Sequence, residues 1–506
     1  MKISTVKKNL TANFMSNGWA ALTAVILTPV YIRLLGIEAW GIVGLYLSLQ
    51  TLCLLLDLGL SATLNRELAR LSLNSDTAQE MRNLVRTIEM IYWAIALFLG
   101  GSVFLLAPVI ANKWVHANQL SPATIQNAIR LMGVTLCLQW PFGLYSGGLS
   151  GLQRQVTLSA INIGVSTLRG LAIIIVLATV SPTLGAFFLC QIGASTLQTC
   201  LAGLFLWRTL PRTALSSRFQ TTSLRRLWRF SAGMSGIMIL SVILTQMDKV
   251  ILSGILSLEH FGYYVLASTV AVGIYLPVTP IYSALYPRFT QLVTLGDQEA
   301  LKQLYHQGCQ LMSVAILPVS VVIALFSRQV LLLWTGDVIT ADHTHTVLSI
   351  LIAGTALNGS IYLPYAFQFA HGWTKLAFSI NLVAVVVLIP LLIVAASRYG
   401  AVGAAFTWLI FNCGLTLATV QFMHARLLKG EQWKWYVEDV GLPLTVSLAT
   451  GAICVLLVPK DGPRLQLLIM LAGVTLFIGI ATTLVTPVAR QALINYLRSR
   501  TASQST

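Results

Sequence analysis

The sequence predicts an all-α polytopic membrane protein of about 14 transmembrane helices, built as two six-helix lobes plus two C-terminal helices. Composition is the first observation: 56% of the 506 residues are hydrophobic and 9% are charged, and the mean hydropathy is +0.79. Soluble domains carry roughly 25% charged residues. The second observation is a series of apolar runs of roughly 20 residues, enough for a helix to cross a hydrocarbon layer of about 30 Å. The third is an internal repeat.

The apolar runs, cut at polar turns, give the predicted membrane segments in chain order: 14–35, 40–64, 87–111, 125–147, 157–180, 184–207, 230–256, 261–285, 308–334, 345–369, 376–397, 401–424, 439–458 and 466–486. The first run is too long for the apolar region of a signal peptide and lacks a small-residue cleavage site, so we expect a retained helix. Alternating strand patterns are not found in the sequence, which favours helices over a β-barrel.

Basic residues predict the orientation. With the N-terminus inside, most of the 32 Lys and Arg residues fall in the terminal tails and the even-numbered loops. This bias predicts that both termini are cytoplasmic. The net charge of +16 is then mainly an orientation signal, and we expect no nucleic-acid partner.

The repeat is clearest in the stretch PVYIRLLGIEAWG, residues 29–41. At an offset of 221 positions, Glu38 and Gly41 correspond to Glu259 and Gly262, whereas Arg33 corresponds to Gly254. Both copies begin on the same side because each contains six helices, which makes this a parallel repeat. The predicted domains are 1–207, the N-terminal lobe; 208–229, a basic cytoplasmic linker; 230–436, the C-terminal lobe; and 437–506, two appended helices, expected to flank one lobe, and a tail.

Several features argue against disulfides, metal sites and a catalytic domain. The seven cysteines lie in apolar runs without paired spacing, so neither a disulfide framework nor a zinc site is expected. His343 and His345, two positions apart, would point to different sides of a helix, and no metal site is expected there. The loops are at most about 20 residues long, which is short for the catalytic domain of a membrane glycosyltransferase or ligase. We expect no enzyme activity and no cofactor.

Charged residues inside the apolar segments are the candidates for function, because a charge near the bilayer centre is costly and normally faces a cavity or a partner. The cations of the outer half are Arg33, Arg130, Arg169 and Lys249.

Among the embedded acids, Asp57 and Asp248 are the weaker candidates, for ion coupling or for orienting those cations. Some of these charged residues, cations and acids alike, also have a simpler interpretation. Arg33 could extend to the outer interface, and Asp57 could accept hydrogen bonds from a neighbouring helix beside a kink at Gly59. Asp248 and Lys249 are adjacent, so they point about 100° apart, which argues against a mutual pair.

Three stretches resemble a known family: PVYIRLLGIEAWGIVGLYLSL, LLLDLGLSATLNRELA and QMDKVILSGILSLEHFGYY. They are similar to the polysaccharide transporters, or Wzx-type O-antigen flippases, of the multidrug/oligosaccharidyl-lipid/polysaccharide flippase superfamily. The likeness covers residues from about 10 to 430 and is strongest in the two hairpins; the last two helices occur in only part of such families.

The resemblance implies a flippase that moves a lipid-linked oligosaccharide, on an undecaprenyl diphosphate carrier, across the bacterial cytoplasmic membrane by alternating access. Its partners would be that substrate, membrane lipids and other polysaccharide assembly proteins. The four embedded cations would then contact the headgroup and the diphosphate. A drug or cation antiporter of the same superfamily is the main alternative; it should have a carboxylate-centred cavity, whereas embedded cations outnumber embedded acids here.

Overall fold

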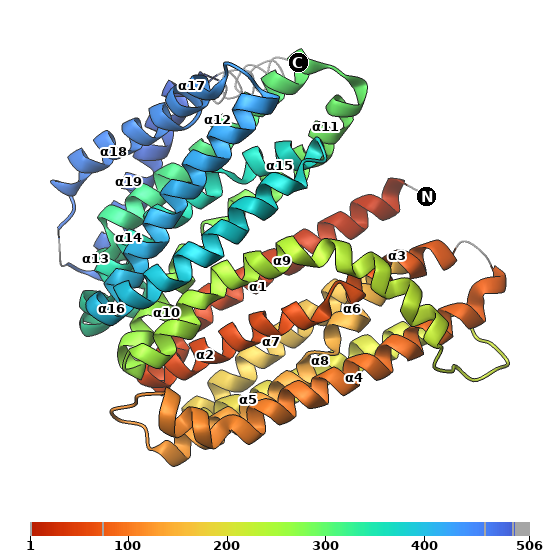
Figure 1. The fold of residues 1–506 in the computed structure, drawn as a ribbon. Coiled ribbons are helices and arrows are strands. Elements are labelled where there is room, and N and C mark those ends of the chain that lie inside the picture. Colours follow the sequence, from red (N-terminus) through yellow and green to blue (C-terminus); the bar gives the residue numbers. More distant parts are fainter. Residues whose placement is uncertain (1–2, 73–74, 460–461, 488–489, 491–506) are drawn as a thin grey trace, which may run out of the picture. The chain divides into compact units, whose positions relative to one another are not determined.

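The computed structural model describes residues 3–72, 75–459, 462–487 and 490, and these residues are helical almost throughout. By its internal contacts the chain divides into two compact units, Met1–Gly262 and Tyr263–Thr506. Each unit is a bundle of long helices (Figure 1). The predicted all-α membrane architecture is confirmed.

Unit 1 contains the first nine helices and the start of the tenth. Their bounds are α1 Ile3–Leu35, α2 Ile37–Cys53, α3 Leu60–Leu71, α4 Ala78–Val109, α5 Pro122–Gln139, α6 Phe142–Gly151, α7 Gln155–Thr179, α8 Leu184–Thr209, α9 Thr221–Ile255 and α10 Leu258–Val272. Within the unit, α5 packs between α4 and α8, and α7 packs between α1 and α8. Helix α9, the first of the second repeat, packs against α2, α3 and α4.

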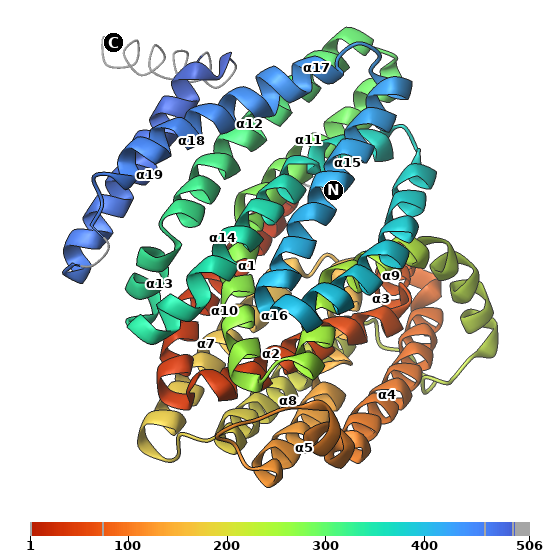
Figure 2. The same cartoon turned by 60° about the vertical axis from the view of Figure 1, so that its left-hand side comes forward.

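Unit 2 contains the remaining helices: α11 Tyr275–Leu295, α12 Gln298–Leu325, α13 Ser327–Thr335, α14 Val338–Ser360, α15 Tyr362–Ala370, α16 Thr374–Leu427, α17 Gln432–Lys434, the π-helical turn η4 Trp435–Gly441, α18 Leu442–Val455 and α19 Arg464–Val485. Helices α18 and α19 lie side by side along α12 (Figure 2). Phe326, Cys454 and Ile478 belong to the shared apolar core. The appended pair therefore flanks the second lobe.

Two segments that were each predicted as one continuous membrane helix are divided into two helices in the structure. Within the predicted segment 40–64, α2 is followed by a 3₁₀ turn, Leu54–Asp57. Helix α3 begins after Leu58 and Gly59, whose φ angles of 47° and 76° are left-handed. The segment 125–147 breaks between α5 and α6 at Trp140 and Pro141, because proline supplies no N–H to continue the helical ladder.

The opposite case is α16, which is 54 residues long and joins two predicted segments. A straight helix of that length would measure about 80 Å, far more than a bilayer. Gly400, with φ 59° and ψ −140°, turns the chain inside it, in the predicted gap between residues 397 and 401. Eleven candidate membrane spans are found among the described residues, so the count of fourteen stays a prediction.

The helix breaks follow the sequence repeat. Trp140, which separates α5 from α6, and Ile361, which separates α14 from α15, are 221 positions apart. Helices α4 and α12 begin at Ala78 and Gln298, 220 positions apart. The same offset that relates the sequence motifs therefore relates the backbone geometry, which confirms the internal repeat.

The two copies of the repeated motif contact each other directly within unit 1. We call residues 37–41 and 258–262 the elbow segments. A Cβ added at Gly41 would lie 2.5 Å from the carbonyl oxygen of Leu258, and one added at Gly262 would lie 2.3 Å from that of Ile37. Because Leu258 and Gly262 are the repeat counterparts of Ile37 and Gly41, the contact is reciprocal. Glycine recurs in the motif because the two backbones touch here.

Glu38 explains the other recurring position of the first elbow segment. Its side chain is 4% exposed, and its two carboxylate oxygens accept from the backbone N–H groups of Asn118, Gln119 and Leu120 at 2.5–3.2 Å. The carboxylate thus holds the connection between α4 and α5. Glu38 therefore has a structural role and is not a substrate contact.

The predicted linker 208–229 is helical at both ends, because α8 continues to Thr209 and α9 begins at Thr221. The loop between them lies on the first turns of α4. Asn83 Oδ1 accepts from the N–H of Arg218 at 2.9 Å, and Thr87 Oγ1 accepts from that of Gln220 at 3.0 Å. The side chains of Arg225, Arg226 and Arg229 lie outside the described residues. Because contacts divide the chain at Gly262, the domain boundaries at 207, 229 and 436 stay predictions.

Candidate functional site

Arg169 is at the centre of a polar network between α7 and α8. Its Nη2 donates to Gln198 Oε1 at 2.8 Å, and Gln198 Nε2 donates to Asn162 Oδ1 at 3.0 Å. The Nε of Arg169 is buried without a hydrogen-bond partner. Among the described residues, the hydrogen-bond partner of this guanidinium is a neutral amide, Gln198, rather than a carboxylate. Its positive charge is therefore oriented by the protein but not neutralised.

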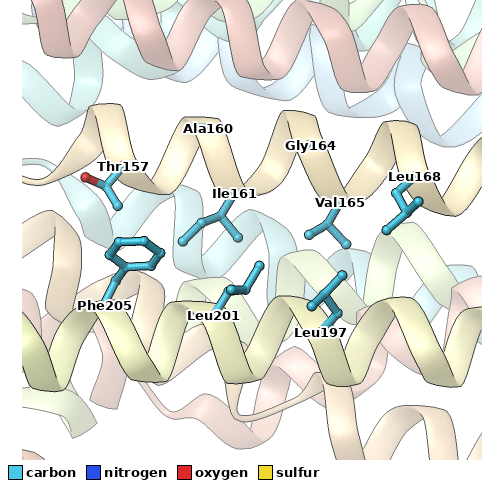
Figure 3. Close-up of a pocket in the computed structure, with 9 residues that line it drawn as sticks. All are labelled: Thr157, Ala160, Ile161, Gly164, Val165, Leu168, Leu197, Leu201 and Phe205. Atoms are coloured by element: carbon cyan, nitrogen blue, oxygen red, sulfur yellow. The ribbon is translucent and has the colours of Figure 1, made fainter.

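An apolar groove runs along the same pair of helices (Figure 3). It has a volume of about 310 Å³ and is lined by Thr157, Ala160, Ile161, Gly164, Val165, Leu168, Leu197, Leu201 and Phe205. Ile161, Leu168 and Leu197 directly precede Asn162, Arg169 and Gln198, and consecutive helical residues point about 100° apart. The helix pair thus has an apolar face that lines the groove and, on the adjacent face, the polar network of Arg169. Such a groove fits a lipid chain.

Arg130 has a different environment from Arg169. Its guanidinium carbon lies 5.5 Å from the centre of the Phe104 ring on α4, and its Nε is buried without a hydrogen-bond partner. A cation over an aromatic face is stabilised by roughly 0.5–2 kcal/mol. Among the described residues, Arg130 and Arg169 have no interaction partner in common, so the structure does not join them in one cluster.

Arg33 is exposed in the last turn of α1, where a cation complements the helix dipole. Its repeat counterpart Gly254 packs against the ring of Trp114, and an added Cβ would lie 2.9 Å from Trp114 Cε2. A long side chain cannot fit at position 254. The charge asymmetry between the two repeats therefore has a packing cause.

The prediction that Asp248 and Lys249 do not pair is wrong. Lys249 Nζ lies 3.4 Å from both carboxylate oxygens of Asp248 on α9, and it also donates to Thr245 O at 3.4 Å. Adjacent Cβ atoms do diverge, but the four-carbon lysine stem is long enough to fold back to its neighbour. The charge of Lys249 is therefore partly compensated within its own helix.

Asp57 lies where the second predicted segment breaks. Tyr92 of α4 donates from its hydroxyl to Asp57 Oδ1, and Ser61 Oγ donates to Oδ2 at 2.9 Å. The kink at Gly59 and the hydrogen bond from a neighbouring helix agree with the simpler interpretation of this residue. Tyr92 also stacks on Trp140, with ring centroids 4.4 Å apart. Asp57 thus ties the broken helix to α4 and α5.

Glu89 is a buried acid whose partners the sequence did not indicate. Its Oε1 accepts from Tyr145 Oη at 2.7 Å and from Trp207 Nε1 at 3.1 Å, and its Oε2 pairs with Arg86 at 2.8 Å. These residues come from α4, α6 and α8. Their separations of 56 and 118 positions leave no signal in a single sequence.

Unit 2 has a neutral polar centre where α11, α14 and α16 meet. Tyr275 donates to Asn358 Oδ1 at 2.8 Å, and Asn358 Nδ2 donates to Asn412 Oδ1 at 2.8 Å. Tyr362 lies beside this pair, with its ring centroid 5.6 Å from that of Tyr275 and 6.1 Å from that of Tyr282. Charged groups gather elsewhere in unit 2, around His306 on α12.

The described ranges contain no group of three or more His, Cys, Asp or Glu residues that could hold a metal ion. His343 instead stacks on Tyr263, with ring centroids 5.1 Å apart, and its Nδ1 lies 2.9 Å from Ile339 O.

Comparison with known families decides the class of protein. Residues 6–293, more than half of the chain, match the model of the family described as polysaccharide biosynthesis protein. The chain belongs to this family. Residues 234–394 also match the MatE family model. The polysaccharide biosynthesis family lies within the multidrug/oligosaccharidyl-lipid/polysaccharide flippase superfamily, so the resemblance inferred from the two hairpins is confirmed.

Individual relatives agree with the family. A putative O-antigen transporter of Shigella flexneri is 23% identical over 424 residues, covering 84% of this chain and 98% of that protein. Among solved structures, the lipid II flippase MurJ in an inward closed conformation has a TM-score of 0.68 at 13% identity, covering 94% of this chain and 98% of that one. An inward-facing multidrug resistance MATE family transporter also scores 0.68, at 14% identity, covering 81% and 96%. At such identities the structural likeness shows the fold.

Proposed function

We propose that this member of the family is a flippase for a lipid-linked oligosaccharide, carried on undecaprenyl diphosphate, in surface polysaccharide biosynthesis. It would act in the bacterial cytoplasmic membrane with both termini cytoplasmic, by alternating access of the two lobes. The Shigella relative, named as a putative O-antigen transporter, supports this substrate class. The observation that carries the proposal is the charge of Arg169, held between α7 and α8 by neutral amides.

The physical argument concerns the cost of that charge. An arginine in the centre of a membrane helix costs at least about 2.5–3.5 kcal/mol, and a neutral hydrogen-bond acceptor compensates a charge less well than a carboxylate does. An anionic substrate group would supply the missing countercharge. A diphosphate offers several oxygens to a guanidinium, which binds such groups through two parallel hydrogen bonds.

Arg33, Arg130 and Lys249 are proposed as further contacts to the headgroup and the diphosphate. Lys249 is the weakest electrostatic partner of the set, because Asp248 already lies 3.4 Å from it. Asp57 and Asp248 are proposed for ion coupling or for orienting the cations. The apolar groove along α7 and α8 is proposed to hold a lipid chain beside Arg169.

The MatE match over residues 234–394 favours one alternative, a drug or cation antiporter of the same superfamily. Its substrate would be cationic, so an uncompensated arginine should not favour its binding. An enzyme is less favoured because the family is one of transporters and we identify no catalytic cluster in the described residues.

The test uses purified protein in liposomes and a fluorescent polyprenyl-diphosphate oligosaccharide. Arg169→Gln removes the charge but retains a donor toward Gln198, so it should reduce the initial flipping rate at least about tenfold, a loss of about 1.4 kcal/mol in barrier stabilisation. Arg169→Lys retains the charge and should lose less. Arg70→Ala, which breaks an exposed pair with Glu67, is the control and should leave the rate unchanged.

Equal flipping rates for Arg169→Gln and the wild type would refute the role of the charge. Uptake of organic cations with no flipping of the lipid would favour the antiporter. Formation of a new glycosidic bond would show an enzyme.

A further inference from the structure

A cluster of ionisable side chains is buried where α12 meets the π-helical turn η4. His306 on α12 is 4% exposed, and Asp439 in η4 has no exposed surface. His306 Nδ1 lies 2.5 Å from Asp439 Oδ2, and Gln310 donates from Nε2 to Asp439 Oδ1 at 3.0 Å. The transport roles proposed above do not use this cluster. π-Helical turns are uncommon and occur frequently at functional sites.

A second carboxylate faces the other nitrogen of the same ring. His306 Nε2 lies 3.2 Å from Glu431 Oε2, within ion-pair distance but without hydrogen-bond alignment. Glu431 belongs to the turn between α16 and α17, where Gly430 has a left-handed φ of 86°. Glu431 also forms an ion pair with Lys302. The imidazole of α12 therefore lies between two carboxylates, one from the turn before α17 and one from η4.

This geometry distinguishes the two protonation states of the ring. A neutral imidazole carries one N–H, so it can donate to one carboxylate, and its remaining lone pair then faces the other. An imidazolium donates to both. With His306 protonated, the charges of Lys302, His306, Glu431 and Asp439 cancel. Loss of the proton would leave a net negative charge beside the fully buried Asp439, and an uncompensated buried charge is strongly unfavourable.

The other ionisable groups around the cluster do not replace that proton. They are Tyr305 and Cys309 on α12, His424 on α16, and Lys434 and Tyr436 on α17 and η4. Tyr305 Oη lies 3.4 Å from His424 Nε2. Lys434 is exposed to solvent, where its charge is screened.

We propose that His306, Asp439 and Glu431 form a proton-binding site that fastens the C-terminal helix pair to the second lobe. With the proton bound, the imidazolium joins η4 to the turn before α17. When the proton leaves, the ring retains its N–H bond to Asp439, and its Nε2 lone pair faces Glu431. The two then repel, so the turn carrying Glu431 loosens from α12. The side chain of Glu431 is 17% exposed, which gives the proton a route to water.

The direct test is a titration of the full-length protein in nanodiscs, with isotope-labelled histidine rings followed by NMR. The chain has seven histidines, and His306→Gln identifies the resonance of interest by its disappearance. We expect the wild-type spectra to show His306 with a proton on both ring nitrogens, because a carboxylate lies against each of them. Asp439→Asn should reduce the doubly protonated fraction of His306, because it removes one of the two carboxylates that face the ring.

The control is His343→Gln, which should leave the His306 resonance unchanged. A His306 ring that carries a single proton throughout the titration, or one that is unaffected by Asp439→Asn, would overturn the proposal. The protonation of the His306 ring is read from the wild type, and His306→Gln serves only to assign its resonance, so misfolding of Asp439→Asn leaves the test intact.

The consequence for transport rests on the proposed flippase function and has a separate readout. In the liposome assay, His306→Gln should flatten the dependence of the flipping rate on pH, whereas His343→Gln should follow the wild type. An unchanged pH profile in His306→Gln would refute the link between the site and transport. Failure of the wild type to flip the lipid would refute the proposed function, while the histidine titration would still decide the proton site.

Discussion

One added methyl group at the crossing of the elbow segments should destabilise unit 1. Gly262→Ala would place Cβ 2.3 Å from the carbonyl oxygen of Ile37, and Gly41→Ala would place it 2.5 Å from that of Leu258. Real Cβ atoms essentially never approach a heavy atom closer than 3.0 Å. The helices must therefore separate by at least about 0.5–0.7 Å. A backbone oxygen cannot rotate away as a flexible side chain can.

The expected magnitude is the difference of two effects. Overpacking a close contact costs about 1–3 kcal/mol, while replacing a helical glycine by alanine returns about 0.5–1 kcal/mol. Because the obstructing atoms are backbone, we expect a net loss of about 1–2 kcal/mol in the free energy of unfolding for each variant. The double variant should lose less than the sum, because one separation of the helices relieves both contacts.

The assay is equilibrium unfolding of the purified protein in mixed micelles, followed by tryptophan fluorescence. Gly101→Ala in α4 and Gly193→Ala in α8 are matched controls, since an added Cβ meets nothing within 4 Å at either position. These controls should equal the wild type or exceed its stability by at most about 1 kcal/mol. If Gly41→Ala and Gly262→Ala were as stable as the controls, the reciprocal backbone contact would not explain the recurring glycine.

Two further predictions concern carboxylates. Glu38→Ala should lower the free energy of unfolding by about 2–4 kcal/mol, because it leaves the N–H groups of residues 118–120 without their acceptor; proteolysis between α4 and α5 should increase, and unchanged stability would contradict the clamp. Burial opposes ionisation of Glu431, but the hydrogen bond and charge of Lys302 outweigh it and lower the pKa of Glu431 below its usual 4.5. The ionised Glu431 therefore stabilises the folded state above about pH 4.5, and this stabilisation is lost as the pH falls through the lowered pKa. The wild type should accordingly lose more stability on acidification than Glu431→Gln. Parallel dependence of stability on acid pH in the two proteins would refute this prediction.

The repeat shows how far a single sequence can be read. Glutamate and glycine recur at an offset of 221, and the structure shows Gly41 in backbone contact and Glu38 holding a loop. The pattern did not reveal that the two copies touch each other. Arg33 and Gly254 differ in sequence for a reason visible in three dimensions, since the ring of Trp114 fills the space at Gly254.

The candidate site was predictable residue by residue but not as an assembly. The cost of burying charge singled out Arg169, Lys249 and Asp57 without any structure. The partners of Arg169 and Asp57 were not predictable, because Gln198 and Tyr92 reach them through the packing of neighbouring helices. Adjacency on a helix even misled the interpretation of Asp248 and Lys249, because side-chain length outweighs the direction of Cβ.

The sequence alone was enough to predict the membrane environment, the helical class, the internal repeat and the family. Apolar runs of bilayer length and recurring turn residues depend only on the local chain. Tertiary structure decided where helices break, which charges are compensated and against which helix the last two helices pack. Those properties depend on which side chains meet across helices, and His306 and Asp439, 133 positions apart, meet because α12 and η4 pack together.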